Sequence, residues 1–140
     1  MPEETYSEIQ VFTDGGARGN PGPAAIAVVV FDDQNRKIEE TGRFIGNTTN
    51  NTAEYLAFLE SLELIKKFNF FRVVFNTDSS LVYNQLKGNW KIKKDSLKPI
   101  VKEIKDKLMG IPNFYINLIP REKNKDADKI VNEILDNLLK

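Results

Sequence analysis

The stretch Ile9-Gln-Val-Phe-Thr-Asp14, followed by Gly15-Gly-Ala-Arg-Gly-Asn-Pro-Gly22, decides how the rest of the chain is interpreted. The first part is an apolar run typical of a β-strand, and it ends on a carboxylate. The second part is a glycine-rich loop that leads into another β-like run, Ala24 to Phe31. A phosphate-binding loop would instead end in Gly-Lys-Ser/Thr and lead into a helix, so the pattern argues against a nucleotide-binding domain. It predicts a sheet with an acidic residue where a strand ends.

Hydrophobic periodicity divides the rest of the chain into strand-like and helix-like segments. The closing helix is expected to bury Ala127, Ile130, Val131, Ile134 and Leu138. Strands are expected at residues 8–13, 24–31, 37–45, 71–76 and 114–119, and helices at 52–67, 79–86, 94–108 and 125–139. This order, βββαβααβα, predicts an α/β fold with a five-stranded mixed sheet, an antiparallel hairpin followed by parallel strands, flanked by helices. One domain is expected over residues 8–139, with residues 1–7 as a short N-terminal extension.

The composition limits the kinds of site that the chain can hold. Its 140 residues suffice for one domain, and 20 basic residues balance 20 acidic ones, so no whole-protein attraction to a polyanion is expected. Cys and His are both absent, which excludes disulfides, metal sites built on those residues and His-dependent triads. A bound metal would need oxygen ligands, which favours Mg²⁺ or Mn²⁺. The polar N-terminus and the lack of an apolar run of about 18 residues predict a cytoplasmic protein with no membrane partner.

Four acidic residues occupy positions that each have an ordinary explanation. Asp14 begins a loop, where Asp is common, and Asp78 precedes a helix that it could cap. Glu54 follows Asn51 by three residues, as in a capping box, and Asp128 near a helix start suits the helix dipole. Taken singly, each acid is therefore as compatible with local structure as with a site.

The four acids together favour a site. Asp14 and Asp78 both follow strands, so they should lie at the same edge of the sheet if those strands are parallel neighbours. Glu54 lies on the helical face expected to meet the sheet, and Asp128 lies at the margin of a buried face. Four converging carboxylates would repel one another unless divalent cations neutralised them. Such a pair of cations is the usual means of cleaving a phosphodiester, so the pattern predicts a two-metal nuclease.

The motifs around these acids resemble those of the type 1 ribonuclease H family. The first signature resembles Thr13-Asp-Gly-Gly-Ala-Arg-Gly-Asn-Pro-Gly-Pro23, and the second resembles Thr48-Thr-Asn-Asn-Thr-Ala-Glu54. Thr77-Asp-Ser79 resembles the third and Pro120-Arg-Glu-Lys-Asn-Lys-Asp-Ala-Asp128 the fourth. A single Thr-Asp-Ser would be a weak signal, whereas four motifs in order over residues 8 to 139 are specific.

The resemblance implies a ribonuclease H-like fold and a metal-dependent endonuclease. Such an enzyme cuts the RNA strand of an RNA–DNA hybrid and leaves 5′-phosphate and 3′-hydroxyl ends. Two ions, Mg²⁺ or Mn²⁺, would be held by Asp14, Glu54, Asp78 and Asp128, with Asp14 bridging both. Asp126 is a rival for the fourth position, but the spacing from Asn124 favours Asp128.

The resemblance also implies contacts to the substrate. Ribose 2′-hydroxyls, which distinguish RNA from DNA, would be contacted by Gly15, Gly16, Asn50 and Ser80. A phosphate of the DNA strand would be contacted by Asn20, Thr49 and Asn51. Lys87, Lys91 and Trp90 could hold phosphates and stack on a sugar or base, and the alternative for Trp90 is packing on the core. Arg121 and Asn124 are expected to brace the last helix rather than to touch substrate.

Two departures from the family pattern bear on activity. Many members carry a His just before the fourth acid, but Arg121-Glu-Lys-Asn-Lys-Asp126 has none. The basic, Trp-rich protrusion of some members is reduced to Leu86-Lys-Gly-Asn-Trp-Lys-Ile-Lys-Lys-Asp95, so weak and salt-sensitive binding is expected. Two alternatives stay open: a related nuclease that also cuts double-stranded RNA, and a hybrid-binding module without activity. A monomer is expected in each case.

Overall fold

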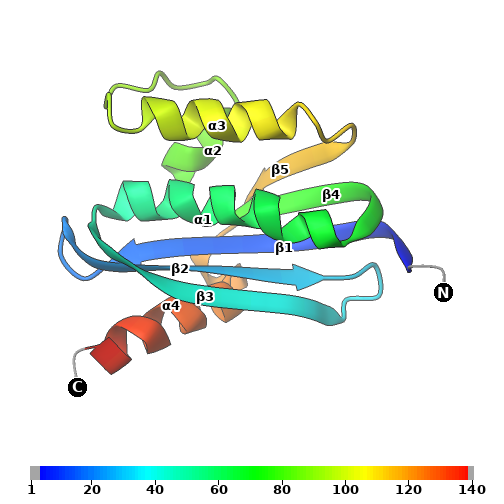
Figure 1. The fold of residues 1–140 in the computed structure, drawn as a ribbon, viewed down its shortest axis with the longest axis horizontal. Helices are drawn as coiled ribbons and strands as arrows, with labels where there is room; N and C mark the ends of the chain where they lie inside the picture. Colours follow the sequence, from blue (N-terminus) through cyan, green and yellow to red (C-terminus); the bar gives the residue numbers. More distant parts are fainter. Residues whose placement is uncertain (1–3, 139–140) are drawn as a thin grey trace.

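The structure of the protein, a computed structural model, describes residues 4–138, and its element order confirms the predicted βββαβααβα (Figure 1). Its elements are β1 (Thr5–Ala17), β2 (Gly22–Phe31), β3 (Lys37–Thr48), α1 (Asn50–Leu64), η1 (Ile65–Lys67), β4 (Asn69–Thr77), α2 (Ser80–Leu86), α3 (Lys98–Leu108), β5 (Phe114–Leu118), η2 (Arg121–Lys123) and α4 (Lys125–Leu138). The predicted domain end at residue 139 and the first three residues of the predicted extension lie outside the described residues.

The five strands form one mixed sheet in the order β3-β2-β1-β4-β5. β1 pairs antiparallel with β2 and β2 with β3, whereas β1 and β4, and β4 and β5, are parallel. In the parallel ladder Thr13 lies opposite Thr77. The residues that follow them, Asp14 and Asp78, are therefore neighbours at one edge of the sheet, as the sequence predicted.

Helices cover the two faces of the sheet unequally. α1 and α3 lie on one side and α4 lies on the other (Figure 1). The larger core joins Tyr55 and Phe58 of α1 and Ile104 of α3 to the sheet. The smaller core joins α4 to β2 through short side chains, including Ala25 and Ala27, which let the helix approach the strand closely. Within residues 4–138, none of the helices is both long and apolar enough to cross a membrane.

Several element boundaries, and the buried face of α4, differ from the predictions. β1 runs from Thr5 to Ala17, so residues 5–7 belong to the sheet and Asp14 lies inside a strand rather than at its end. The extra length follows from pairing on both sides, because β1 is the central strand. α3 begins at Lys98, not at residue 94, because Pro99 has no N–H to donate to the preceding turn and its ring clashes with that turn, so Pro99 is tolerated only in the first turn of a helix. In α4 the last buried position is Leu135, and Leu138 is 47% exposed.

Candidate active site

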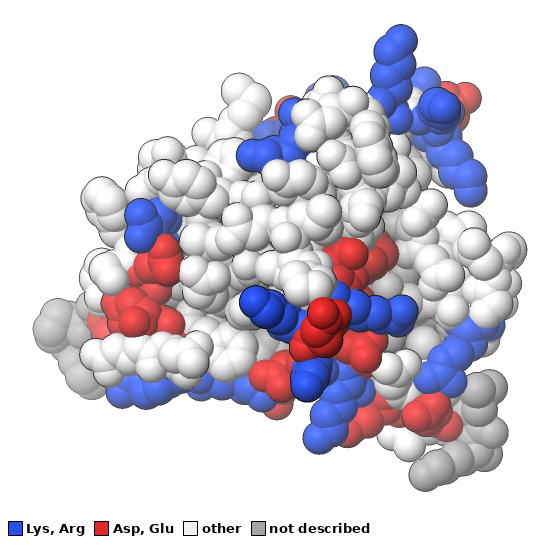
Figure 2. All heavy atoms as spheres, turned by 180° about the vertical axis from the view of Figure 1, so that it is seen from behind, with Lys and Arg blue, Asp and Glu red and all other residues white. Residues whose placement is uncertain are grey.

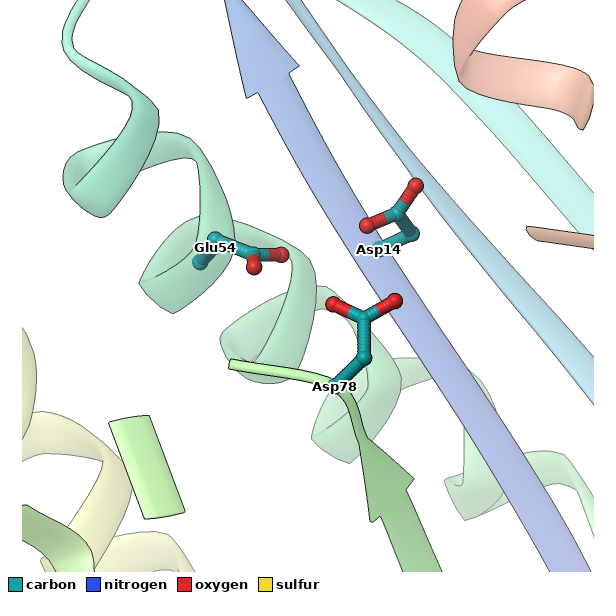
Figure 3. A group of neighbouring side chains, drawn as sticks. All are labelled: Asp14, Glu54 and Asp78. Carbon is teal, nitrogen blue, oxygen red and sulfur yellow. The ribbon is translucent and has the colours of Figure 1, made fainter. Parts of the chain in front are cut away.

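Three carboxylates from three different elements converge at the edge of the sheet. Asp14 comes from β1, Glu54 from α1 and Asp78 from the end of β4, and each offers an oxygen within 4.8 Å of the other two. Figure 3 shows the three side chains pointing toward one another between α1 and the strands. Asp14 is only 7% exposed. The predicted convergence of these three acids is therefore present.

Two features of the backbone bring Glu54 to the strands. A Cβ on Gly15 would lie 2.2 Å from the Ala53 carbonyl oxygen, so only glycine at this position allows α1 to lie so close to β1. The Gly15 N–H in turn donates a 2.8 Å hydrogen bond to Glu54 Oε1. α1 begins at Asn50 and is capped by Thr49, which accepts from Thr52 N–H. Glu54 thus lies in the second turn, and the capping-box explanation for it is wrong.

Asp128 reaches the same region from the opposite face of the sheet. It lines one cavity of about 380 Å³ together with the three clustered carboxylates, but it lies outside their 4.8 Å cluster. Its Oδ2 accepts from Asn132 Nδ2 at 3.2 Å, and its Oδ1 lies 3.8 Å from the Arg121 guanidinium. The rival, Asp126, lines a different cavity and lies 3.8 Å from Lys37. The structure thus places Asp128, and not Asp126, beside the acidic cluster.

Burial and mutual repulsion dominate the electrostatics of the cluster. Burial, followed by repulsion from Asp78 and Asp128, raises the pKa of Asp14 to about 8. Burial and repulsion from Asp14 and Asp78 likewise raise the pKa of Glu54 well above its ordinary value. Carboxylates held so close without a base between them favour protonation or a bound cation. An all-oxygen donor set of this kind suits a hard divalent cation, so the residues fit the metal that the family implies.

Asn124 has a second role beside the one predicted from the sequence. Its backbone carbonyl accepts the Asp128 N–H at 3.1 Å, which braces the start of α4 as expected. Its side chain is 1% exposed, and its Nδ2 donates to the Thr13 carbonyl at 2.9 Å and to Asp78 Oδ2 at 3.0 Å. Asn124 therefore fixes one oxygen of a clustered carboxylate. The spacing between Asn124 and Asp128 is the only sequence signal that pointed to it.

The loop residues predicted to touch substrate are held by one another. Asn50 Oδ1 accepts from Ala17 N–H at 2.7 Å, and Asn20 Oδ1 accepts from Asn50 N–H at 3.0 Å. Thr49 is the cap of α1, as described above. Gly15, Gly16, Asn50 and Asn51 line the acidic cavity, and a Cβ on Gly16 would meet Val131 only at 3.5 Å. Gly15 is thus required for packing, whereas Gly16 has room on its outer side.

The remaining predicted contacts lie around the segment after α2. Ser80 is the exposed first residue of α2, and the Lys87 ammonium lies 5.8 Å from the Tyr83 ring centre. Trp90 is 49% exposed and lines a second cavity of about 530 Å³ with Lys91 and Asn51. About half of the Trp90 surface is therefore accessible, and half is covered by the rest of the chain. Figure 2 shows acidic side chains near the middle of this face and Lys and Arg side chains at the corner where the α2–α3 loop lies.

Known proteins share this fold and these motifs. The profile of the reverse transcriptase-like family matches residues 12–134. Ribonuclease HI of Halobacterium salinarum is 37% identical over 91% of this chain, which spans 64% of that protein's length. A bifunctional protein of Mycobacterium tuberculosis is 32% identical over 92% of the chain, which spans 36% of its length. The chain thus covers less than two thirds of these curated relatives.

Solved structures match over nearly their whole length. LC11-RNase H1, in a crystal structure with an RNA/DNA hybrid, is 42% identical with a TM-score of 0.88, covering 94% of this chain and 99% of that one. RNase H1 of Halobacterium salinarum is 36% identical with a TM-score of 0.89, covering 93% and 98%. The fold and the acidic cavity define an α/β domain with a carboxylate centre at the sheet edge. The chain belongs to the type 1 ribonuclease H family.

Proposed function

We propose that this protein is a metal-dependent endonuclease that hydrolyses the RNA strand of RNA–DNA hybrids, leaving 5′-phosphate and 3′-hydroxyl ends. The observation that carries the proposal is the convergence of Asp14, Glu54 and Asp78 within 4.8 Å, in a cavity that Asp128 also lines. A solved relative of 42% identity, of which the chain covers 99%, is bound to such a hybrid. Uniform surface charge does not explain the proposed binding, since the chain has no net charge.

Asp14, Glu54, Asp78 and Asp128 would hold two divalent ions, Mg²⁺ or Mn²⁺. Bound there, the ions would supply an activated water and stabilise the leaving oxygen. The protein's own contribution is to orient the carboxylates before the metal arrives. Gly15 N–H holds Glu54 Oε1, and Asn124 Nδ2 holds Asp78 Oδ2. Because the chain has no His, proton transfer in the proposed reaction must use solvent or another side chain.

The hybrid would lie across the two cavities that share Asn51. On the acidic side, Gly15, Gly16 and Asn50, with Ser80 nearby, would contact ribose 2′-hydroxyls, the groups that separate RNA from DNA. Around Asn51, a phosphate of the DNA strand would meet Asn20 and Thr49. Lys87, Trp90 and Lys91 would supply charge and a stacking surface at the far side. Action as a monomer in the cytoplasm stays a prediction.

The decisive experiment is cleavage of an end-labelled RNA–DNA hybrid in Mg²⁺ and in Mn²⁺. The unchanged protein is compared with Asp78→Asn and with Asp106→Asn, a matched control on the exposed surface of α3. We expect the RNA strand to be cut by the unchanged protein and by Asp106→Asn, and EDTA or Asp78→Asn to abolish cutting. Duplex RNA and single strands are tested beside the hybrid, because cutting of duplex RNA would establish the broader nuclease. Binding of the hybrid without cutting in either metal would instead establish a non-catalytic module.

A further inference from the structure

Asp128 differs from the other three acids in how its position is determined. Asp14, Glu54 and Asp78 lie on elements that pack directly on one another, β1 with β4 and α1 on β1. Asp128 comes from α4, on the other face of the sheet, and its side chain lines the cavity. The orientation of its carboxyl group can therefore also be set by neighbours outside the cluster.

Those neighbours form a chain of polar contacts along one side of α4. Asn132, one helical turn after Asp128, donates from Nδ2 to Asp128 Oδ2 at 3.2 Å. Asn132 Oδ1 accepts from the Arg18 guanidinium at 3.1 Å. The same guanidinium nitrogen lies 2.9 Å from Asp136 Oδ1, one further turn along the helix. Arg18 reaches α4 from the loop between β1 and β2 and lines the acidic cavity together with Asn132.

The hydrogen-bond donors and acceptors in the series Arg18–Asn132–Asp128 cannot exchange roles. A guanidinium only donates hydrogen bonds, so the atom of Asn132 that faces Arg18 must be its carbonyl oxygen. The other end of the amide, which faces Asp128, must then be the N–H₂ group. Arg18 thereby selects the amide orientation that presents a donor to the Asp128 carboxylate. In its absence the amide could turn and present an oxygen, which would repel the carboxylate.

The chain of contacts is poorly placed to serve stability. The side chain of Arg18 is 35% exposed and that of Asp136 is 61% exposed. Ion pairs this close to solvent add little to the free energy of unfolding. Of the two acids in these contacts, Asp128 lines the acidic cavity and Asp136 does not. The contacts therefore act mainly on the orientation of the Asp128 carboxylate.

Resting on the proposed function, we propose that Arg18 and Asn132 are positioning residues that hold the Asp128 carboxylate in the orientation needed to bind a divalent cation. Neighbours that orient metal ligands typically change metal affinity or activity by about 10–100-fold when they are removed. Because Asn132 holds only one oxygen of a partly exposed carboxylate, we expect an effect near the lower limit, about tenfold.

The test measures Mn²⁺ and Mg²⁺ binding to the protein alone by calorimetry, and the metal concentration that half-saturates hydrolysis. Asn132→Leu removes the donor while keeping a helix-forming side chain of similar shape, and Arg18→Met removes the guanidinium but keeps its apolar stem. Asn137→Ala, an exposed residue of the same type on α4, is the matched control. Arg18→Lys keeps a cationic donor toward Asn132 and should keep metal affinity near that of the unchanged protein. Thermal unfolding in EDTA establishes that each variant is folded.

The proposal predicts metal affinity about tenfold weaker in Asn132→Leu and in Arg18→Met, with Asn137→Ala unchanged. Excess metal should restore most of the turnover. Unaltered metal binding in both variants would overturn the proposal, whether or not hydrolysis is reduced. A loss of hydrolysis that excess metal does not restore, with metal binding unaltered, would instead assign Arg18 to the substrate. Because metal binding is measured on the protein alone, the outcome is independent of whether the unchanged protein cuts the hybrid.

Discussion

At the scale of single residues, the buried side-chain amide of Asn124 connects the sheet to the acidic cluster. Its Nδ2 joins the Thr13 carbonyl of β1 to the Asp78 carboxylate. Asn124→Ala should lower the free energy of unfolding by about 1–3 kcal/mol, because the Thr13 carbonyl is left without its donor in a buried position. Asn124→Asp should cost more at pH 8 than at pH 5, since an ionised carboxylate would face Asp78, whereas a protonated one can still donate.

Urea unfolding in EDTA at the two pH values measures both effects. Asn137→Asp on the exposed side of α4 is the control for a new charge at the surface. An equal loss of stability at pH 5 and pH 8 for Asn124→Asp would mean that the group does not face a charged neighbour.

The residues of the candidate site were predictable to different degrees for a physical reason. Asp14, Glu54 and Asp78 follow from local patterns, since each acid lies in a short motif of its own segment, Thr13-Asp-Gly-Gly16, Thr52-Ala-Glu54 and Thr77-Asp-Ser79. The contact between Arg18 and Asn132 joins residues 114 positions apart, and it depends on how closely α4 approaches the β1–β2 loop. That distance is set by short side chains such as Ala25 and Ala27. No local sequence pattern predicts that α4 packs on them. The sequence therefore predicted the clustered carboxylates but did not predict the contact between Arg18 and Asn132.

At the scale of elements, the contact between β1 and α1 depends on Gly15. Its missing side chain leaves room for the Ala53 carbonyl, which a Cβ would approach to 2.2 Å. Gly15→Ala should destabilise the protein by about 1–3 kcal/mol, because either the helix or the strand must move. The same shift would separate Glu54 from Asp14, so metal binding should weaken with stability.

Gly16→Ala is the matched comparison for this packing, because its Cβ would meet Val131 only at an ordinary contact distance of 3.5 Å. Chemical denaturation of both variants should show a clear difference in the free energy of unfolding. Similar losses for the two variants would contradict a specific role of Gly15 in the packing of α1.

Element boundaries were predicted less well than element order. The order survives because it depends on the hydrophobic pattern, which is a continuous apolar run in β2 and a clear helical period in α4. The start of α3 was placed four residues too early because the periodic pattern continues upstream of Pro99, whereas a proline can occupy only the first turn of a helix. The length of β1 depends on pairing with both β2 and β4, and pairing is a property of the sheet and not of the strand's own sequence.

The segment between α2 and α3 should govern the salt dependence of hybrid binding. Lys91, Lys93 and Lys94 are exposed there and line the cavity beside Trp90. The double variant Lys91→Gln/Lys94→Gln should weaken binding and reduce the slope of log K against log salt by about 0.7–0.9 for each phosphate that is no longer neutralised. Anisotropy titrations in an Asp78→Asn background would measure this without cleavage.

Lys102→Gln/Lys105→Gln on α3 removes the same amount of charge from another surface. It serves as the control for a general change in the field of the protein. Equal slopes for the two double variants would show that the segment after α2 makes no specific phosphate contact.

At the scale of the whole molecule, the chain has no net charge, but its acidic and basic residues gather in different regions. Lys plus Arg equal Asp plus Glu, yet acids gather in the central cavity and eight Lys lie between residues 87 and 107 with three acids. The fold brings this about by placing the ends of β1 and β4 at one edge, with α1 and α4 closing on it from opposite faces. The acidic centre is therefore a cost to the folded state unless a counter-charge is present.

That cost predicts how stability changes with pH. The pKa of Asp14 is raised from 3.8 to about 8 and that of Glu54 is raised in the same direction, so the folded protein keeps protons that the unfolded chain releases above about pH 4. Between about pH 4 and pH 8 the unfolded state thus binds fewer protons, and the free energy of unfolding should fall as pH rises. The size of the fall should be on the order of a few kcal/mol in EDTA.

Divalent metal should reverse this trend, because it binds the ionised carboxylates of the folded state and not the unfolded chain. Calorimetric unfolding across this range should show Mg²⁺ raising Tm strongly at pH 8 and weakly at pH 5. Asp14→Asn should flatten the profile in EDTA and raise Tm at pH 8, since it removes the most repelled charge, while it weakens the response to Mg²⁺. A substitution that stabilises the protein and removes its metal response is the expected mark of a site where folding and function compete. A flat profile in EDTA, or a destabilising Asp14→Asn at pH 8, would show that the carboxylates do not repel one another in solution as their geometry requires.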